Sequence, residues 1–171
     1  ENKSRDKESV YEIVNLKNRI MNKTKGDYIE GRDIMLFVNS GAAESNPTWV
    51  KTAAATSHTI SYSGETKERV TKDAENGAFS QKSVTKLSCT ITCEALKTFD
   101  ADMGYDTLLK QMKLRKPVKL KYGYTESETG TSYEEGLFVI TNLEESSPAD
   151  DDANYSATFE NTGNVETKQQ A

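Results

Sequence analysis

The sequence has little of what most active sites are built from. It holds one histidine, two cysteines and one tryptophan in 171 residues. It contains no Walker loop, no G-x-G-x-x-G turn and no G-x-S-x-G elbow, which are the common signatures of nucleotide-binding proteins and of serine hydrolases. We therefore predict that the protein has no catalytic residue, binds no cofactor and no metal, and is not an enzyme.

The single histidine and both cysteines fall within predicted strands. His58 has Ser57 and Thr59 as neighbours, which point to the opposite face of a strand, so we interpret it as a hydrogen-bonded strand histidine. Cys89 and Cys93 are four strand residues apart, about 13 Å at roughly 3.3 Å per residue. A disulfide requires Cα atoms within about 7 Å, so we interpret both thiols as small buried side chains.

Long apolar runs and an excess of basic residues are also missing. No run of about 18 apolar residues occurs, and we expect no contact with a membrane. The net charge is −5, from 27 acidic and 22 basic residues, which argues against a surface that holds nucleic acid by its phosphates. The run 150–152 is all aspartate but lacks the pattern of a calcium loop, so we interpret it as a solvated acidic loop.

The sequence is instead rich in strand patterns. The clearest alternation covers 84–95, where every second residue from Leu87 to Ala95 is apolar or cysteine and the residues between are polar. A continuous apolar run at 34–38 predicts a strand buried on both faces. Further strands are predicted at 56–63, 118–124, 136–143 and 155–159.

Helical spacing occurs in one place with clear ends. Tyr105, Leu108, Leu109 and Met112 recur at the interval of an amphipathic helix over 104–115, and Pro117 ends it. A thinner apolar stripe predicts a second, short helix over 7–21.

Together these patterns predict a mainly β protein of the α+β class. We expect a β-sandwich or small barrel of about six to seven strands with one flanking helix. Residues 1–31 are predicted to be an N-terminal extension with the short helix, 32–161 the β domain, and 162–171 a polar C-terminal tail that frays. The polar segment 64–82 contains Asn76-Gly77, a hairpin signal, and predicts either a long strand–turn–strand excursion or a flexible loop.

Five segments in this order resemble the major tail protein, the tube-forming subunit, of long-tailed, non-contractile phages. They are Gly31–Val38, Ala55–Thr66, the elements Lys72-Asp73 and Gly77-Ala-Phe79, the strand pattern Lys86, Ser88, Ile91, Glu94 and Leu96, and the helix start Gly104-Tyr-Asp-Thr-Leu108. The similarity covers about 31–161, and the first 30 residues have no counterpart in it.

The resemblance implies a β-sandwich-like, phage tail-tube-like fold and a structural role. Its partners would be further copies of the chain in stacked hexameric rings, other tail proteins, and DNA that passes through the lumen without specific binding. The protein would be made in the bacterial host cytoplasm and reside in the virion tail. A loop of about 70–84 would contact the next ring, and the proposed inter-subunit residues are Val70, Lys72, Asp73, Asn76, Gly77, Phe79 and Lys82.

Two other functions fit the same patterns. One is the tube protein of a contractile injection or type VI-like secretion system. The other is a binding module such as a β-sandwich carbohydrate-binding domain, which would need a planar row of exposed aromatics. Tyr122 and Tyr124 share a strand face, but we expect them to belong to the core.

Overall fold

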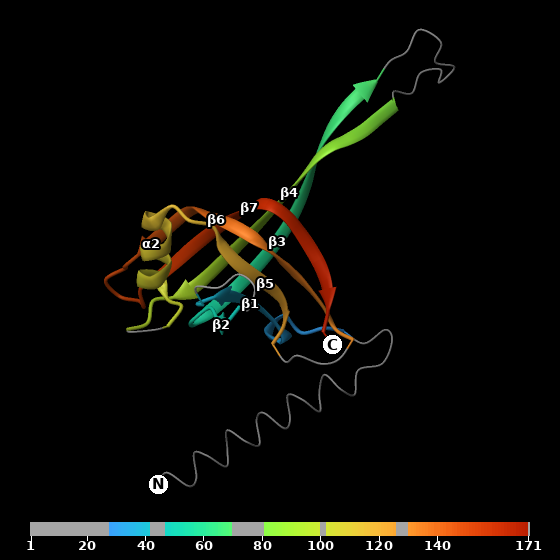
Figure 1. The fold of residues 1–171 in the computed structure, drawn as a ribbon. Coiled ribbons are helices and arrows are strands. Elements are labelled where there is room, and N and C mark those ends of the chain that lie inside the picture. The colour runs from blue at the N-terminus through green and yellow to red at the C-terminus, as the bar shows by residue number, and fades with distance from the viewer. Residues whose placement is uncertain (1–27, 42–46, 70–80, 100–101, 126–129, 171) are drawn as a thin grey trace.

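The computed structural model describes residues 28–41, 47–69, 81–99, 102–125 and 130–170 (Figure 1). The predicted helix over 7–21 lies outside these residues. The described elements are the 3-10 helix η1 (Gly31–Asp33), the helix α2 (Tyr105–Leu114) and the strands β1 (Ile34–Asn39), β2 (Trp49–Lys51), β3 (Ala55–Arg69), β4 (Gln81–Leu96), β5 (Val118–Tyr124), β6 (Ser132–Ser146) and β7 (Asn154–Gln169).

The strands form one antiparallel sheet of seven, in the order β2-β1-β5-β6-β7-β4-β3. Its two edge strands, β2 and β3, are consecutive in the chain and are joined by residues 52–54 alone. The sheet must therefore curl until its edges approach each other. No ladder joins β2 to β3 in the described part of the chain, so the curled sheet is not closed. The predicted mainly β architecture, its number of strands and its helix are confirmed.

The core fills the inside of the curled sheet. Phe138, Phe159, Leu36, Ile91 and Leu108 are among its largest buried apolar side chains, each at most 2% exposed. They come from β6, β7, β1, β4 and α2. The alternation predicted for 84–95 is confirmed from Cys89 to Ala95, where every second side chain is buried. The core therefore depends on residues far apart in the sequence.

The helix α2 begins and ends as its sequence predicts. Leu108 on its apolar face is fully buried, and the ring of Tyr105 meets Tyr155 of β7 edge to face at 5.8 Å. Arg115 adopts the left-handed conformation with φ of 55°, and its N–H donates to Met112 O, before Pro117 prevents further helix. No helix among the described residues is long and apolar enough to cross a membrane.

Three local predictions need correction. Within the predicted C-terminal tail 162–171, residues 162–169 are not frayed, because β7 continues to Gln169 in register with Ser132 of β6. Backbone hydrogen bonds hold this half of β7, and these need no apolar side chains. The strand β6 begins at Ser132 and not at Gly136, and a further short strand that was not predicted, β2, pairs with β1.

Candidate assembly interface

A two-stranded arm leaves the body of the domain (Figure 1). β7 pairs with β4 only from Thr90 to Leu96, so among the described strands residues 81–89 of β4 form ladder pairs with β3 alone. We call residues 62–69 and 81–89 the arm. Of the two alternatives for 64–82, the strand excursion is confirmed at both described ends. An isolated two-stranded ribbon is marginally stable in water, so this arm is a candidate for contact with a partner.

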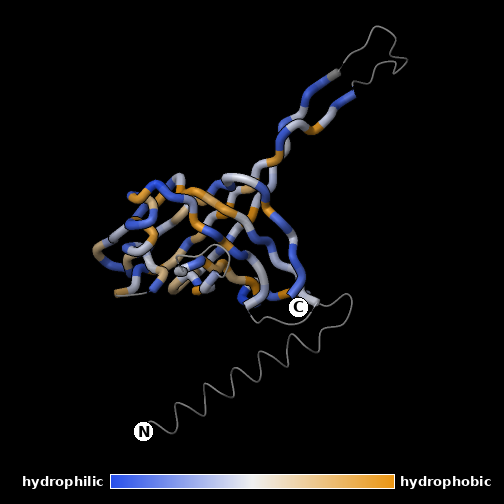
Figure 2. Tube along the Cα trace, viewed as in Figure 1, coloured by the Kyte–Doolittle hydropathy of each residue, from blue (hydrophilic) through white to orange (hydrophobic). Residues whose placement is uncertain are grey.

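The arm carries an apolar strip on the same face as the core. Tyr62, Val84 and Leu87 are 53%, 61% and 73% exposed, and we call these three residues the apolar strip. Figure 2 shows hydrophobic segments on the arm among hydrophilic ones. Large apolar side chains gathered on a projecting element are typical of a surface that a partner covers.

A bulge in β4 is what brings the apolar strip together. Gly64 pairs with Leu87 and Thr66 pairs with Val84, which leaves Thr85 as the extra residue on β4. Val84 and Leu87 are three residues apart and would lie on opposite faces of a regular strand. The extra residue shifts the alternation, so both side chains lie on the same face. Gly64 lies beneath both, because a Cβ at this position would be 3.2 Å from Val84 Cγ1 and 3.6 Å from Leu87 Cδ2. A Cβ at position 64 would therefore contact Leu87 normally but would require Val84 to shift by a few tenths of an ångström.

Charged pairs border the apolar strip without giving the arm a strong charge. Lys86 Nζ lies 3.4 Å from Glu65, and Lys82 Nζ lies 3.3 Å from Glu68. All four side chains are more than half exposed, and such pairs contribute at most about 1 kcal/mol. Their main effect is to match opposite charges across the two strands, which fixes the register of the arm.

The base of the arm is tied to the opposite side of the curled sheet. The hydroxyl of Tyr62 donates to Glu134 Oε2 of β6 at 3.0 Å, and Thr167 of β7 donates to Glu134 Oε1 at 2.7 Å. Burial, the neighbouring Cys89 and the carboxylate of Glu134 all raise the pKa of Tyr62, so its hydroxyl remains a donor at neutral pH. The arm is therefore anchored where it leaves the body.

Most of the predicted inter-subunit residues lie outside the described residues. This holds for Val70, Lys72, Asp73, Asn76, Gly77 and Phe79, and only Lys82 is placed, on the arm. Sequence reasoning missed Val84 and Leu87 as contact residues. Their place in the apolar alternation of 84–95 is visible in the sequence, but their exposure is not, because it follows from β7 pairing with β4 only from Thr90 onward.

The potentially reactive side chains, one histidine and two cysteines, are hydrogen-bonded or buried in the fold. Thr52 donates its only hydroxyl hydrogen to Leu36 O at 2.9 Å, so His58 Nε2, 3.1 Å from the same oxygen, must be the donor in that bond. The predicted hydrogen-bonded strand histidine is confirmed. Both cysteines are free and buried, as predicted, and burial raises the pKa of the Cys93 thiol to about 11. This thiol is protonated at neutral pH.

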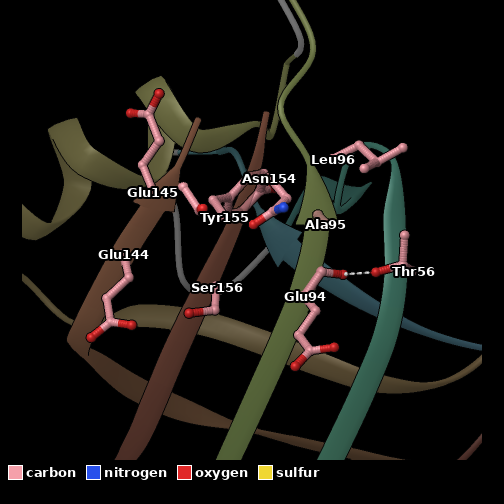
Figure 3. A pocket seen from close by; sticks show the side chains of 10 residues that line it. Thr56, Glu94, Ala95, Leu96, Glu144, Glu145, Asn154, Tyr155 and Ser156 are labelled. Atoms are coloured by element: carbon pink, nitrogen blue, oxygen red, sulfur yellow. Dashed lines mark hydrogen bonds between the residues drawn. The ribbon is translucent and has the colours of Figure 1, made fainter. Parts of the chain in front are cut away.

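A shallow pocket of about 460 Å³ lies at the end of β4, β7 and β6 (Figure 3). Glu94, Glu144 and Glu145 contribute carboxylates to its lining, and Tyr155 also lines it. Burial raises the pKa of Tyr155 to about 12, and its hydroxyl has no hydrogen-bond partner. No group of three or more potential metal ligands occurs within the described ranges.

His58 makes the stability of the domain depend on pH. Burial lowers the pKa of His58 below its usual value of 6.5, so the unfolded chain takes up a proton first as the pH falls. We expect the free energy of unfolding to fall as the pH decreases from about 7 through 6.5 and on to the lower pKa of the folded state. Urea unfolding at a series of pH values would measure this.

The variant His58→Gln provides the control for this titration. Glutamine keeps a donor for Thr52 but does not titrate, so stability above about pH 5.5, where carboxylates remain ionised, should become flat. An unchanged slope in the variant would show that another group is responsible.

Comparison with known proteins places this fold. The chain is similar to the tail of the empty gene transfer agent particle, a structure with C6 symmetry (15% identity, TM-score 0.64, covering 82% of this chain and 99% of that chain). It is also similar to the SPP1 tail tube (14% identity, TM-score 0.65, covering 83% of this chain and 80% of that chain). A third similar structure is a chain of the anti-feeding prophage baseplate (6% identity, TM-score 0.58, covering 85% of this chain and 98% of that chain). A search of curated protein sequences finds no match.

The fold is therefore one that the subunits of tail tubes adopt, here with a projecting arm. The sequence profile of the phage tail tube protein family matches residues 28–167, and the chain belongs to that family. The resemblance to major tail proteins of non-contractile phages is confirmed. The protein is a structural subunit of a tail tube, and its place is the virion tail.

Proposed function

We propose that this tube subunit assembles into hexameric rings that stack and enclose a channel for DNA. The main observation that supports this proposal is the arm, a two-stranded ribbon whose apolar strip is exposed in the single subunit. β3 adds a long open edge, since its 15 residues pair only with β4 among the described strands. Such an edge is a template for pairing with another chain.

Rotational symmetry makes these contacts head to tail. An edge on one subunit then meets a different surface on the next, and the contacts close into a ring. The C6 symmetry of the gene transfer agent tail supports six copies in each ring.

The arm is proposed to make the contact between subunits. Val84 and Leu87 of the apolar strip would be covered by the neighbouring copy, along with the predicted contact residues Val70, Lys72, Asp73, Asn76, Gly77, Phe79 and Lys82. The sheet that supports the arm reaches Gln169, and the family match begins at residue 28. Residues 1–31 are proposed to be an extension of this domain.

We also propose that the protein has no catalytic role. The only histidine donates a hydrogen bond to Thr52, and burial raises the pKa of both cysteine thiols. A buried, protonated thiol is a poor nucleophile. The subunit's partners would be its own copies, other tail proteins and DNA that passes without specific binding.

Assembly of the purified full-length chain tests the proposal. Concentrated protein, alone and seeded with fragments of preformed tubes, is followed by light scattering and negative-stain microscopy. We expect hollow tubes whose end views average with six-fold symmetry. Protein that stays monomeric in every condition, or rings with another number of subunits, would contradict the proposal.

A further inference from the structure

The two ends of β4 lie on opposite sides of the subunit and differ in chemistry. At its N-terminal end β4 forms part of the arm, and its C-terminal residues Glu94 to Leu96 line the shallow pocket of Figure 3. Figure 1 shows β4 running from the arm to the far side of the body. Its 16 residues span roughly 50 Å, so the arm cannot touch this far end within one subunit. Copies stacked end to end bring the two together.

The end of β4 away from the arm is strongly acidic. We call residues 94–99 and 144–156 the acidic end. They hold six acidic residues and one basic residue, a formal charge of −5, which equals the net charge of the whole chain. Lys97 N donates to Ala153 O at 2.7 Å, and this bond holds the loop with the aspartates 150–152 beside the end of β4.

The basic residue of the acidic end neutralises only one of the carboxylates. Lys97 Nζ lies 2.7 Å from Glu145 Oε1. The other five acidic residues are exposed and form no ion pair with another described residue. They are Glu94, Glu144 and the three aspartates of 150–152. A surface with this excess of negative charge favours a partner that presents lysine or arginine.

The acidic end also exposes apolar side chains. Leu96 is 39% exposed and lines the shallow pocket, and Phe99, three residues later, is 101% exposed beside the start of α2. Apolar residues surrounded by charged ones are the usual layout of a protein–protein contact. The acidic end therefore has both an apolar part and a charged border.

The arm has the complementary composition. Residues 62–69 and 81–89 hold four basic and two acidic residues, a formal charge of +2 in an acidic chain. Lys82 and Lys86 each face a glutamate of the arm, but their side chains are 57% and 75% exposed. A lysine ammonium has three hydrogens to donate, so each can bind a second carboxylate. The apolar strip lies between these charges.

We propose that the arm of one subunit docks on the acidic end of a subunit in the next ring. The apolar strip would pack on Leu96 and Phe99, and the lysines of the arm would meet Glu94, Glu144 and the aspartates of 150–152. This inference rests on the proposed function, because docking of this kind requires stacked rings, and it names the receiving surface. A head-to-tail contact between opposite ends repeats along an axis without closing, as a tube requires.

Charge reversal tests the docking. Lys82→Glu with Lys86→Glu reverses the arm, and Glu94→Lys with Glu144→Lys reverses the acidic end. Each pair alone should raise the concentration needed for assembly roughly tenfold or more, because like charges then meet at every contact. The chain with all four substitutions should assemble within about threefold of wild type, since the two changes compensate each other. Light scattering measures assembly, and circular dichroism confirms that each variant folds.

A matched control shows whether compensation is local. The reversed arm combined with Glu160→Lys and Glu166→Lys has the same net charge, but these two positions on β7 lie outside the acidic end. This control should assemble no better than the reversed arm alone. Equal recovery in the control, or no recovery in the chain with four substitutions, would overturn the docking and leave the tube intact. Wild-type protein that forms no tubes would defeat the proposed function, and the docking with it.

Crosslinking shows whether the contact runs between rings. The variant Lys82→Cys with Asp151→Cys carries one thiol on the arm and one at the acidic end, while the native Cys89 and Cys93 are buried at 2% and 0% exposure. Tubes are treated with a flexible bis-maleimide, denatured and separated by size. We expect a ladder that continues beyond six copies, because each subunit is linked to one in the ring before and one in the ring after.

The length of the ladder decides between two directions of contact. A ladder that ends at six copies would place the contact within a ring, and intact tubes without crosslinks would exclude it altogether, so either result would overturn the inference. Each single-cysteine variant is a control and should give dimers at most. If the first pair prevents assembly, Lys67→Cys with Asp150→Cys, both at exposed positions, gives the same reading.

Discussion

The variant Leu87→Asp is expected to lose tube formation while its subunit remains folded. Leu87 is 73% exposed in the subunit, so the change removes little packing there, and surface substitutions usually stay within about 0.5 kcal/mol. In the assembled tube the same position would be covered. Burial of a leucine contributes about 1.5–3 kcal/mol, and a buried unpaired carboxylate is strongly unfavourable. Because every subunit carries the change, the loss is repeated at each contact.

Sedimentation velocity and negative-stain microscopy would measure this loss, and circular dichroism would confirm the fold. We expect at least about a tenfold rise in the concentration needed for assembly, since 1.4 kcal/mol corresponds to a factor of ten. The matched control is Ser88→Asp, which adds the same charge to the next residue on the opposite, polar face. Tubes of normal length from Leu87→Asp would show that the apolar strip is not a contact.

Truncation of Phe159 to alanine should remove a large part of the free energy of unfolding of the domain. Phe159 is fully buried in β7, in register with Ile91 of β4 and Ile140 of β6. Removing such a ring leaves a cavity and typically destabilises a protein by about 3–5 kcal/mol. Domains of this kind have only about 5–15 kcal/mol of stability in total. Urea denaturation followed by circular dichroism would measure the change.

The chain provides an unusually close control for this prediction. Phe99→Ala makes the same chemical change at a position that is 101% exposed, and it should alter the midpoint of unfolding very little. Similar losses from both variants would mean that the buried cluster around Phe159 does not dominate stability.

The sequence predicts the elements whose patterns are local. The alternation around Ile91 and the helical spacing around Leu108 each place one face in the core, and the structure agrees. The second half of β7 could not be found this way, because Val165 is the only large apolar residue in 162–169 and backbone pairing to β6 extends along the segment. A strand stabilised in this manner leaves no periodic signal. The short strand β2 was not predicted either, since three residues are too few to show a period.

Sequence reasoning singled out part of the segment that forms the candidate interface, but not the exposed side chains on it. Sequence reasoning directed attention to 64–82, and the described arm overlaps this range at 64–69 and 81–82. The exposure of Leu87 could not be predicted, because it continues the alternation of buried Cys89 and Ile91. Whether such a residue is covered depends on where β7 stops pairing with β4, which is a property of two distant segments.

What the sequence by itself determined is the chemistry: few reactive side chains, strands that alternate, one amphipathic helix that ends before Pro117, and five segments similar to tail tube proteins. Only the tertiary structure decided which parts of those strands face water. It curls one sheet so that its edges meet at residues 52–54, leaves the arm beyond the reach of β7, and gathers carboxylates of β4 and β6 at the end of β4 opposite the arm. The physical reason is that side-chain alternation is local, whereas burial depends on strands brought together from across the chain.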